Sequence, residues 1–568
     1  MKKTTSMLIA AAVGLLLPVG TLFAGTKAPN APTSHKWKFS PTINAPWAME
    51  DDQEPLDSPI DAAGLCRSNP FTTTGAYGPL GSNVDVITGD VVNNSGFSNF
   101  GCTTPQNETT IAVNPTNANN LIAGANDYRV CCDFDGLNDG TGWAYYSTDA
   151  GATWKNVQLP KLTAETGATG VFKKFDSAGD PVIAFSPDGI AYYANIVFSR
   201  VSPASGVVVS VSSDGGKNWS PPNMVAYQDA GNFFLDKEWI GAGANGKVVV
   251  TWTRFNQGPH GASYLSSPIV GAISNDYGKT WNRQGFPISD AAHPFNQGSQ
   301  VAFDGGGALY VAYEGSSPTT GYATDALVLA RSTDDGRSFQ TVELARVYDD
   351  LDCYPIYSGR QTLTDMHFRL NSYPSMSIDR VTGNIAITWT DNQGSGNCGT
   401  GAPAFIGTAT ANQVKLVSGT WPAIATAAVT AITTSAPDKV FPSVAAANGK
   451  TVVGYYTRDY GITSVAIICN EGTNDNPGSV IPPSPTARSV CMDYAAKTST
   501  DAFGAQTRLS TESSNPFIQF ANGSFIGDYT QVAISPNGLK AHAAWTDFRG
   551  NPGVTPANQD VMFQSFAP

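Results

Sequence analysis

One short motif recurs along the chain and constrains what the chain can fold into. Its form is Ser-x-Asp-x-Gly-x-x-Trp, and its copies begin at Ser147, Ser212, Ser274 and Ser332, with Phe339 in place of the last tryptophan. In such a motif an aspartate caps backbone N–H groups, a glycine takes the positive φ of a tight turn, and an aromatic ring packs back on the sheet. Each copy follows a run typical of a β-strand, so the motif predicts four equivalent hairpin turns.

A longer repeat contains this motif and extends the pattern to seven units. Each unit begins with a small apolar strand, passes through a turn, and ends its second apolar strand in polar residues. The first strands start near Thr110, Pro181, Glu238, Gln300, Pro374, Pro442 and Thr530. Self-similarity at this spacing is typical of β-propellers, and seven four-stranded blades fit it best, with six blades as the alternative.

The composition agrees with an all-β chain. The 57 glycines and 37 prolines among 568 residues, with only 14% charged residues, favour short strands joined by turns over packed helices. The last unit supplies only three strands before the C-terminus, so we expect the alternating segment 83–88 to add the fourth strand and close that blade. The predicted fold is a single β-propeller over 83–568, preceded by an extended segment over 25–82.

The N-terminus has the pattern of an export signal. Lys2 and Lys3 precede an apolar stretch that is too short to cross a bilayer, and a cleavage site is expected after Ala24. No later stretch approaches the ~20 apolar residues of a membrane helix. We therefore expect a secreted protein, extracellular or periplasmic, that has no membrane span and is a monomer.

The eight cysteines agree with export, because they lack the C-x-x-C spacing of zinc or redox sites. Disulfides are therefore expected throughout. Proximity along the chain predicts the pairs Cys353 with Cys398 and Cys469 with Cys491, and leaves Cys66 and Cys102 for the adjacent Cys131 and Cys132.

Charge and motif content exclude other classes of function. The formal net charge of −13 would repel phosphate backbones, which excludes nucleic acid as a partner. The five histidines are scattered, which argues against a zinc or iron centre. No phosphate-binding loop or dinucleotide fingerprint occurs in the required context, so no cofactor is expected to be required.

The face opposite the Ser-x-Asp-x-Gly turns is the predicted functional face. In a blade, the first strand starts and the second strand ends at the edge opposite the turn that follows the third strand. Polar residues collect at these positions: Glu108, Asp127, Arg129, Asp236, Lys237, Glu238, Arg254, Glu314, Asp391, Arg458, Asp528, Tyr529, Asp547 and Arg549. They would converge above the channel as a concave site. The alternative is that each binds only its own turn or a neighbouring charge.

The repeated motif resembles the Asp box of the BNR-repeat propellers, which include the sialidases. The resemblance implies a propeller that binds or cleaves glycans through the face opposite the boxes. Sialidases hold the substrate carboxylate with three arginines, use a Tyr–Glu pair as nucleophile, and protonate the leaving group with an aspartate. Carried over to this chain, the resemblance implies Tyr529 as nucleophile with Glu238 or Glu314 behind it, and an acid in the loop that holds Asp135 and Asp139.

The resemblance to sialidases lacks one arginine. The segment Asn107-Glu108-Thr109-Thr110 stands where the first blade of that family carries an arginine of the triad. Glu108 at that corner would repel a substrate carboxylate by on the order of 1 kcal/mol at about 4 Å, so we expect weak or absent cleavage of sialosides. The expected ligand-binding residues are Arg129, Arg254, Arg458, Arg549, Asp127, Asp391 and Asp547.

One loop also has the composition of a calcium site. Asp133, Asp135, Asn138 and Asp139 offer oxygen ligands close together, which suits a hard cation, although Ala144 stands where an EF-hand has its closing glutamate. The two interpretations are a structural Ca²⁺ site and an Asx-rich loop without metal.

Two further functions fit the same pattern. The first is a non-catalytic extracellular propeller that binds a partner. The second is a polysaccharide lyase, which would need a tyrosine or histidine base and arginines to neutralise a uronate. Because one fold hosts all of these functions, the sequence alone does not choose among them.

Overall fold

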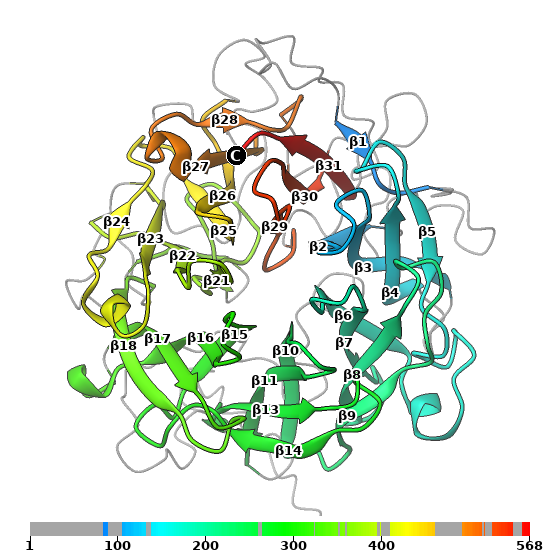
Figure 1. The fold of residues 1–568 in the computed structure, drawn as a ribbon. Helices are drawn as coiled ribbons and strands as arrows, with labels where there is room; N and C mark the ends of the chain where they lie inside the picture. The colour runs from blue at the N-terminus through cyan, green and yellow to red at the C-terminus, as the bar shows by residue number, and fades with distance from the viewer. Residues whose placement is uncertain are drawn as a thin grey trace, which may run out of the picture.

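A computed structural model describes residues 83–88, 105–131, 138–258, 264–322, 324–349, 353–357, 360–394, 398, 409–460, 491–513, 516, 525–548 and 559–568. The described residues form a closed ring of β-sheets around a central axis (Figure 1). The expected leader, 1–24, and the expected extended segment, 25–82, lie outside the described residues.

Seven four-stranded antiparallel sheets make up the ring. Blade 1 is β2 (Gln106–Val113), β3 (Leu121–Cys131), β4 (Asn138–Ser147) and β5 (Lys155–Gln158); blade 2 is β6 (Ser177–Phe185), β7 (Ala191–Phe198), β8 (Ser205–Ser212) and β9 (Asn223–Gln228). Blade 3 is β10 (Phe233–Ala242), β11 (Val248–Gln257), β13 (Ile269–Ser274) and β14 (Asn282–Pro287), with β12 (Tyr264–Ser266) beside β11; blade 4 is β15 (Asn296–Phe303), β16 (Leu309–Ser316), β17 (Asp325–Ser332) and β18 (Gln340–Val347). Blade 5 is β21 (Ser375–Ile378), β22 (Ile385–Asp391), β23 (Gln413–Gly419) and β24 (Thr430–Ala431); blade 6 is β25 (Lys439–Ala447), β26 (Lys450–Thr457), β27 (Asp493–Thr498) and β28 (Thr507–Arg508). The predicted all-β propeller of seven blades is confirmed.

Blade 7 closes the ring with both ends of the chain. It contains β29 (Gln531–Ile534), β30 (Ala541–Asp547), the C-terminal β31 (Asp560–Phe566) and the N-terminal β1 (Val84–Asp85). Val84 pairs with Phe563, and Asp85 with Met562. The predicted closure of the last blade by the segment 83–88 is therefore confirmed.

Side chains of the innermost strands tie neighbouring blades together. The innermost strands of neighbouring blades meet at seven junctions. At five of them, within the described strands, a side chain of one blade accepts a hydrogen bond from a backbone N–H of the next blade. The bonds run from Ile183 N to Thr110 Oγ1 (3.1 Å), Met376 N to Gln300 Oε1 (2.6 Å), Val444 N to Ser375 Oγ (3.1 Å), Val532 N to Ser443 Oγ (3.0 Å) and Ile111 N to Gln531 Oε1 (3.0 Å). The equivalent positions at the other two junctions hold Val182 and Trp239. A buried N–H needs a partner, so these bonds satisfy the backbone where blades meet.

The Ser-x-Asp-x-Gly turns have the geometry that the sequence predicts. Ser147 Oγ donates to Asp149 Oδ1 (2.7 Å) and accepts from the N–H of Gly151 (2.9 Å). Trp154 Nε1 donates to the Gly151 carbonyl (3.1 Å), and its ring packs edge-on against Phe563 of blade 7. Gly151 has a φ of +90°, and a Cβ there would collide with the Phe563 ring. This turn therefore packs onto blade 7 and requires glycine at position 151.

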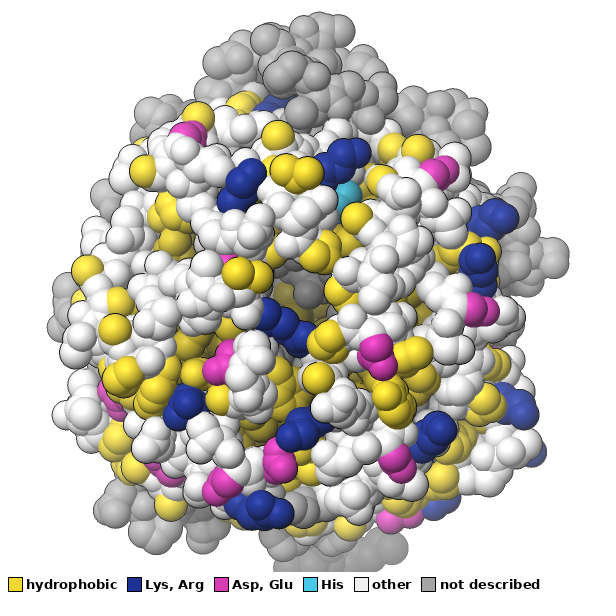
Figure 2. All heavy atoms as spheres, in the orientation of Figure 1, with side chains coloured by type: hydrophobic (Ala, Val, Ile, Leu, Met, Phe, Trp, Pro, Cys, Tyr) yellow, Lys and Arg dark blue, Asp and Glu magenta, His cyan; other side chains and the backbone are white. Residues whose placement is uncertain are grey.

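The turns and the polar strand ends lie at opposite edges of the blades. In blade 1, Ser147 pairs with Leu121 at the start of β3, whereas Asp127 near the end of β3 pairs with Gln106 at the start of β2. The face opposite the turns therefore carries the starts of the innermost strands. Figure 2 shows one face of the ring along its axis, with a hollow at the centre and lysine or arginine side chains at the edge of this hollow.

A long connection between blades 4 and 5, residues 348–374, is here called the cap segment. It contains β19 (Ile356–Tyr357) and β20 (Arg360–Gln361). Its apolar side chains share one buried core with side chains of blades 6 and 7: Tyr354, Leu363, Met366, Phe368 and Leu370 pack with Val440, Tyr456 and Trp545. The cap segment therefore covers one part of the ring.

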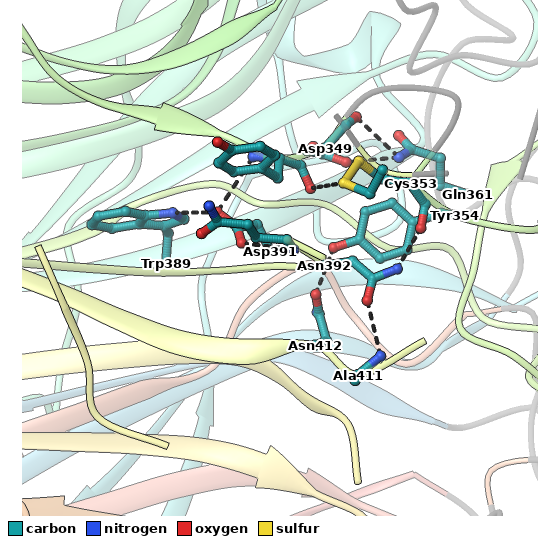
Figure 3. Close-up of a disulfide and its surroundings, with 12 residues drawn as sticks. Asp349, Cys353, Tyr354, Gln361, Trp389, Asp391, Asn392, Ala411 and Asn412 are labelled. Atoms are coloured by element: carbon teal, nitrogen blue, oxygen red, sulfur yellow. Dashed lines mark hydrogen bonds between the residues drawn. A yellow bond between two sulfur atoms is a disulfide. The ribbon is translucent and has the colours of Figure 1, made fainter. Parts of the chain in front are cut away.

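The disulfide between Cys353 and Cys398 fastens the cap segment to the connection between β22 and β23 (Figure 3). This pair was predicted from the sequence and is confirmed. Cys491 is also disulfide-bonded, and Cys469, its predicted partner, lies outside the described residues. Within the described part of the chain, no helix is long and apolar enough to cross a membrane.

Replacing Trp219 with alanine should destabilise the protein by about 3 kcal/mol, as for other buried aromatics. Its indole packs edge-on against Tyr193, and its N–H is bonded to Gly216. Urea denaturation measures the loss, with Tyr277→Ala, at a partly exposed aromatic of another turn, as the control. Ligand binding by the folded variant should not change, and its loss would contradict the assignment of the functional face.

Candidate functional site

A bulge at one repeated position brings side chains to the channel. In five innermost strands a residue with φ between 49° and 66° sits where the pairing register shifts: Glu108, Asp180, Lys237, Gly298 and Phe441. Positive φ is costly for residues other than glycine, and bulges re-aim side chains. The equivalent positions of the other two blades hold Tyr373 and Tyr529. Charged residues therefore occupy blades 1 to 3 at this level, and aromatic residues occupy blades 5 to 7.

A buried ion cluster joins these blades. The ammonium of Lys237 lies 3.1 Å from Glu108 Oε1, 2.9 Å from Asp180 Oδ2 and 3.0 Å from Asp528 Oδ2. Arg369 of the cap segment binds Asp528 through two bonds of 2.7 Å, from Nε and from Nη2. Every member is less than a tenth exposed, so each charge depends on the others for compensation.

The cluster separates the pKa values of its members. Burial opposes the charge on Lys237, but Asp180, Asp528 and Glu108 outweigh it and hold the pKa well above its usual value. Burial also opposes ionisation of Asp528, but Arg369 and Lys237 hold the pKa of that carboxyl well below its usual value. For Glu108, burial and the charge of Asp180 raise the pKa well above the ordinary range.

A pocket that opens to solvent, here called the first cavity, lies beside this cluster. Its charged wall includes Lys237, Glu238 and Asp528, and its aromatic wall includes Trp239, Tyr373, Phe441 and Tyr529. A second cavity borders the same Asp528, Asn371 and Tyr373 and is also lined by Arg360, Gln361 and Arg369 of the cap segment. The two cavities therefore meet at Asp528.

Glu238 is the unusual member of the first cavity. Its side chain is 1% exposed, and neither carboxyl oxygen has a hydrogen-bond partner on another described residue. Burial, followed by the charge of Asp180, raises the pKa of Glu238 well above its usual value, so its surroundings favour the neutral carboxyl. Buried polar groups are nearly always bonded, and one that faces a cavity without a partner marks a place where a ligand can supply it.

Tyr529 shares this cavity with Glu238, as the sequence grouped them. Its hydroxyl donates to the Pro181 carbonyl (3.0 Å), and its ring packs edge-on against Trp239. Burial, followed by the charges of Glu108 and Asp180, raises the pKa of Tyr529 well above its usual value. The phenol therefore stays protonated, and this arrangement suits sugar stacking better than nucleophilic attack.

The other predicted catalytic and metal-binding residues lie elsewhere. Glu314 is buried on β16 opposite Gln297 and lines neither cavity. Asp133 and Asp135 lie outside the described residues, and Asn138 and Asp139 begin β4 opposite Cys131 and Val130. Among the described residues, no group of three or more acidic, histidine or cysteine side chains is placed to hold a metal ion. The calcium loop stays a prediction.

The predicted arginines are paired inside their own blades. Arg129 forms a salt bridge of 2.7 Å with Asp127 and stacks on Trp143. Arg458 forms one of 3.0 Å with Asp438. These two arginines do not line either central cavity, because a carboxylate close by within the same blade already binds each of them.

The remaining predicted ligand-binding residues follow the same rule. Arg254 donates to Asn256, Asp391 binds Lys415 at 2.7 Å, and Asp547 accepts the indole N–H of Trp545 at 3.0 Å. Arg549 lies outside the described residues. The described ligand-binding candidates are therefore distributed over the blades and line neither cavity, whereas other members of the predicted ring, Glu108, Lys237, Glu238, Asp528 and Tyr529, do meet at the ion cluster and the first cavity.

Sequence reasoning did not single out Asp180 or Arg369. Asp180 stands three residues before Ile183, as Glu108 and Lys237 stand three residues before Ile111 and Ile240, so alignment of the seven units on these isoleucines could have found it. Arg369 lies in the cap segment, which has no counterpart in the other units, and no periodic signal marks it.

Comparison with known proteins agrees with the repeat. The family model for the BNR/Asp-box repeat matches residues 145–156. The matched segment contains the first of the four Ser-x-Asp-x-Gly turns, so the chain is a β-propeller that carries an Asp-box repeat in its first blade. No curated protein sequence matches it.

Among solved structures, this Asp-box β-propeller is similar to a protein of unknown function from Dyadobacter fermentans, with 14% identity, 66% of this chain and 94% of that chain covered, and a TM-score of 0.40. It is also similar to a Penicillium chrysogenum alpha-L-arabinanase complexed with arabinobiose, with 10% identity, coverage of 86% and 98%, and a TM-score of 0.39. A Trypanosoma rangeli sialidase matches at 14% identity, coverage of 63% and 53%, and a TM-score of 0.37.

Replacing Lys237 with alanine should destabilise the propeller by about 3 to 5 kcal/mol near pH 7, because it leaves buried carboxylates without their shared cation. Urea denaturation measures this loss. Lys174→Ala, which breaks an exposed pair with Asp229, is the control and should have little effect. The penalty should shrink in acid as the carboxyls become protonated, and a loss that does not depend on pH would contradict the ion-cluster description.

Proposed function

We propose that the protein is an exported glycoside hydrolase that holds a neutral glycan in the central cavity opposite the Asp boxes. Glu238 is the general acid that protonates the glycosidic oxygen. Asp528 is the ionised carboxylate that faces the same space and stabilises positive charge as it develops on the sugar. The observation that carries this proposal is the pair of buried carboxyl groups in one cavity.

The two carboxyl groups have opposite protonation states. Burial keeps Glu238 neutral, and the two cations beside Asp528 keep it ionised. Glycoside hydrolysis generally uses one carboxylic acid and one carboxylate across the scissile bond. Carboxyl groups whose environments push their pKa values apart are the usual acid and base assignments in such sites.

The aromatic wall supports a sugar as the ligand. Trp239, Tyr373 and Tyr529 line the same cavity as its charged residues. A sugar ring has apolar C–H faces and polar hydroxyl edges, so a cavity with one aromatic side and a few polar groups matches it.

The charges of the cluster support a neutral glycan over an acidic one. Lys237 and Arg369 are already held by Asp180 and Asp528 at hydrogen-bond distances. A substrate carboxylate would have to compete with these protein carboxylates for the same two cations. Sialic acid is therefore a poor candidate substrate.

Two observations support export. The N-terminal sequence has the pattern of a leader, and the structure contains the Cys353–Cys398 disulfide. Disulfides persist mainly in oxidising compartments.

A screen of neutral polysaccharides and neutral aryl glycosides, with a fluorogenic sialoside beside them, tests the proposed function. We expect release of sugar from a neutral substrate, loss of at least about 100-fold in kcat for Glu238→Gln, and retained binding. Glu314→Gln, at a buried glutamate outside both cavities, is the matched control and should keep activity.

Other outcomes of this screen would contradict the proposal. Sialoside turnover that is lost in Tyr529→Phe would restore a sialidase assignment. Glycan binding without turnover in any substrate class would make the protein a binding module.

Glu238→Gln should also stabilise the protein as the pH rises. The folded-state pKa of Glu238 is raised, so above the unfolded-state value of about 4.3 the unfolded chain ionises while the folded chain does not. Wild-type stability should therefore lose about 1.4 kcal/mol per pH unit from this group between the two pKa values. Denaturation at pH 4 and pH 8 should show the variant gaining relative to wild type at the higher pH, and an equal difference at both would contradict the neutral buried acid.

A further inference from the structure

We infer that the Cys353–Cys398 disulfide positions the central site, because it anchors the cap segment that delivers the Arg369 guanidinium to Asp528. The inference rests on the proposed function only in assigning Asp528 to that site. Its geometry, and the first of its tests, do not require a ligand.

The anchor lies between the cap segment and blade 5. The disulfide joins Cys353 of the cap segment to Cys398, in the connection between β22 and β23. Beside it, Asn392 Nδ2 donates to the Cys353 carbonyl, and the Tyr354 hydroxyl donates to Asn412 Oδ1 at 2.6 Å (Figure 3). Both cysteines are buried, so this anchor belongs to the folded interior.

Hydrogen bonds connect the region of the disulfide with the part of the cap segment that contains Arg369. The bonds run from Thr362 N to the Pro355 carbonyl (3.0 Å), from Leu370 N to the Gln361 carbonyl (2.8 Å), and between Thr364 and Thr410 in both directions (3.1 and 2.9 Å). Leu370 directly follows Arg369, so the bond from Leu370 N to Gln361 fixes the backbone from which the Arg369 side chain extends. These bonds therefore link the described parts of the cap segment between the disulfide and the ion cluster.

The cap segment then positions the guanidinium against blade 7. Arg369 binds both oxygens of Asp528 and lies over the Phe525 ring at 4.4 Å. Asn371 Nδ2 donates to the backbone carbonyl of Asp528 at 3.1 Å. Arg369 and Asp528 are separated by 159 residues, so no local backbone geometry sets their distance. The two-point guanidinium–carboxylate contact depends on where the cap segment lies.

Arg369 is therefore a positioning residue. Through the paired contact it holds Asp528 in one orientation and keeps it ionised, and Asp528 borders both cavities. A disulfide that only stabilised the fold would leave this contact intact in any variant that remains folded. A disulfide that positions the site would loosen the contact first.

Hydrogen exchange on the full-length protein tests the inference without a ligand. In the folded double variant Cys353→Ser/Cys398→Ser, we expect amides of 525–530 to exchange at least about tenfold faster than in wild type, as they should in Arg369→Ala. Arg508→Ala, which removes a buried arginine paired with Asp493 at 2.6 Å, is the matched control and should leave 525–530 unchanged. Unchanged exchange at 525–530 in the folded cysteine variant would overturn the inference.

A double-mutant cycle gives a second measurement. Arg369→Gln and Asp528→Asn should be coupled by at least about tenfold in the unfolding equilibrium constant when the disulfide is present, and by less than about threefold in the cysteine double variant. Arg369→Lys, which keeps the charge and loses the two-point geometry, should restore only part of the coupling. Equal coupling in both backgrounds would overturn the inference.

If the cysteine variant does not fold, the same exchange experiment on wild type, after reduction under conditions that keep it folded, decides between the two interpretations. Failure of the proposed function is distinguishable from failure of this inference. A protein that cleaves no glycan, yet shows linked exchange at 525–530, would retain the positioning role and lose only the hydrolase assignment.

Discussion

The structure depends on one buried ammonium group, that of Lys237 on blade 3, which carboxyl groups of three other blades share. Three carboxyl groups, from blades 1 and 2 and from the start of blade 7, point at the channel, where water cannot screen them. Lys237 from blade 3 compensates them together, and Arg369 adds a second cation from outside the blade repeat. Such clusters seldom raise stability over an apolar core, but their geometry is demanding. They therefore specify how the blades meet at the axis more than they hold the blades together.

The sequence repeat makes the fold predictable, but it does not indicate which residues form the candidate site, because the site depends on differences between the repeat units. Seven similar units specify seven blades, and the incomplete last unit indicates that the segment around Val84 must return to close it. At the level of Lys237, however, the ring works because its units differ: charged residues in blades 1 to 3 face aromatic residues in blades 5 to 7. A ligand would meet a polar and an apolar side in one cavity. The features that the seven units share specify the propeller, and the residues in which the units differ give the cavity its charged and aromatic lining.

Some residues of the candidate site could be predicted from the sequence and others could not, and the difference has a physical cause. Tyr529 and Glu238 could be grouped, because the starts of innermost strands in a propeller converge on the axis. Arg129 was placed by the same kind of rule, but a strand end also offers a local carboxylate, and Asp127 binds it two residues away. Arg369 could not be predicted, because its position depends on tertiary packing of a connection that occurs once in the chain. The position of a residue was predictable where the residue belongs to a repeat unit, and it was not predictable where tertiary packing alone places the residue at the site.

The side chains that relay hydrogen bonds from blade to blade have a mechanical consequence. Within the described innermost strands, the relay is interrupted on both sides of blade 3, where Val182 and Trp239 replace the polar acceptor. Pairs of side chains join blade 3 to its neighbours instead. Lys237 lies 2.9 Å from Asp180 of blade 2, and Thr251 bonds to Ser299 (2.9 Å) and Asp236 to Gln297 (3.3 Å) of blade 4. It is also the blade that presents Lys237 and Glu238. A ligand in the channel that repositioned either side chain would therefore act directly on the junctions of blade 3, whereas at the five relayed junctions the bond is made to a backbone N–H that the strand holds in place.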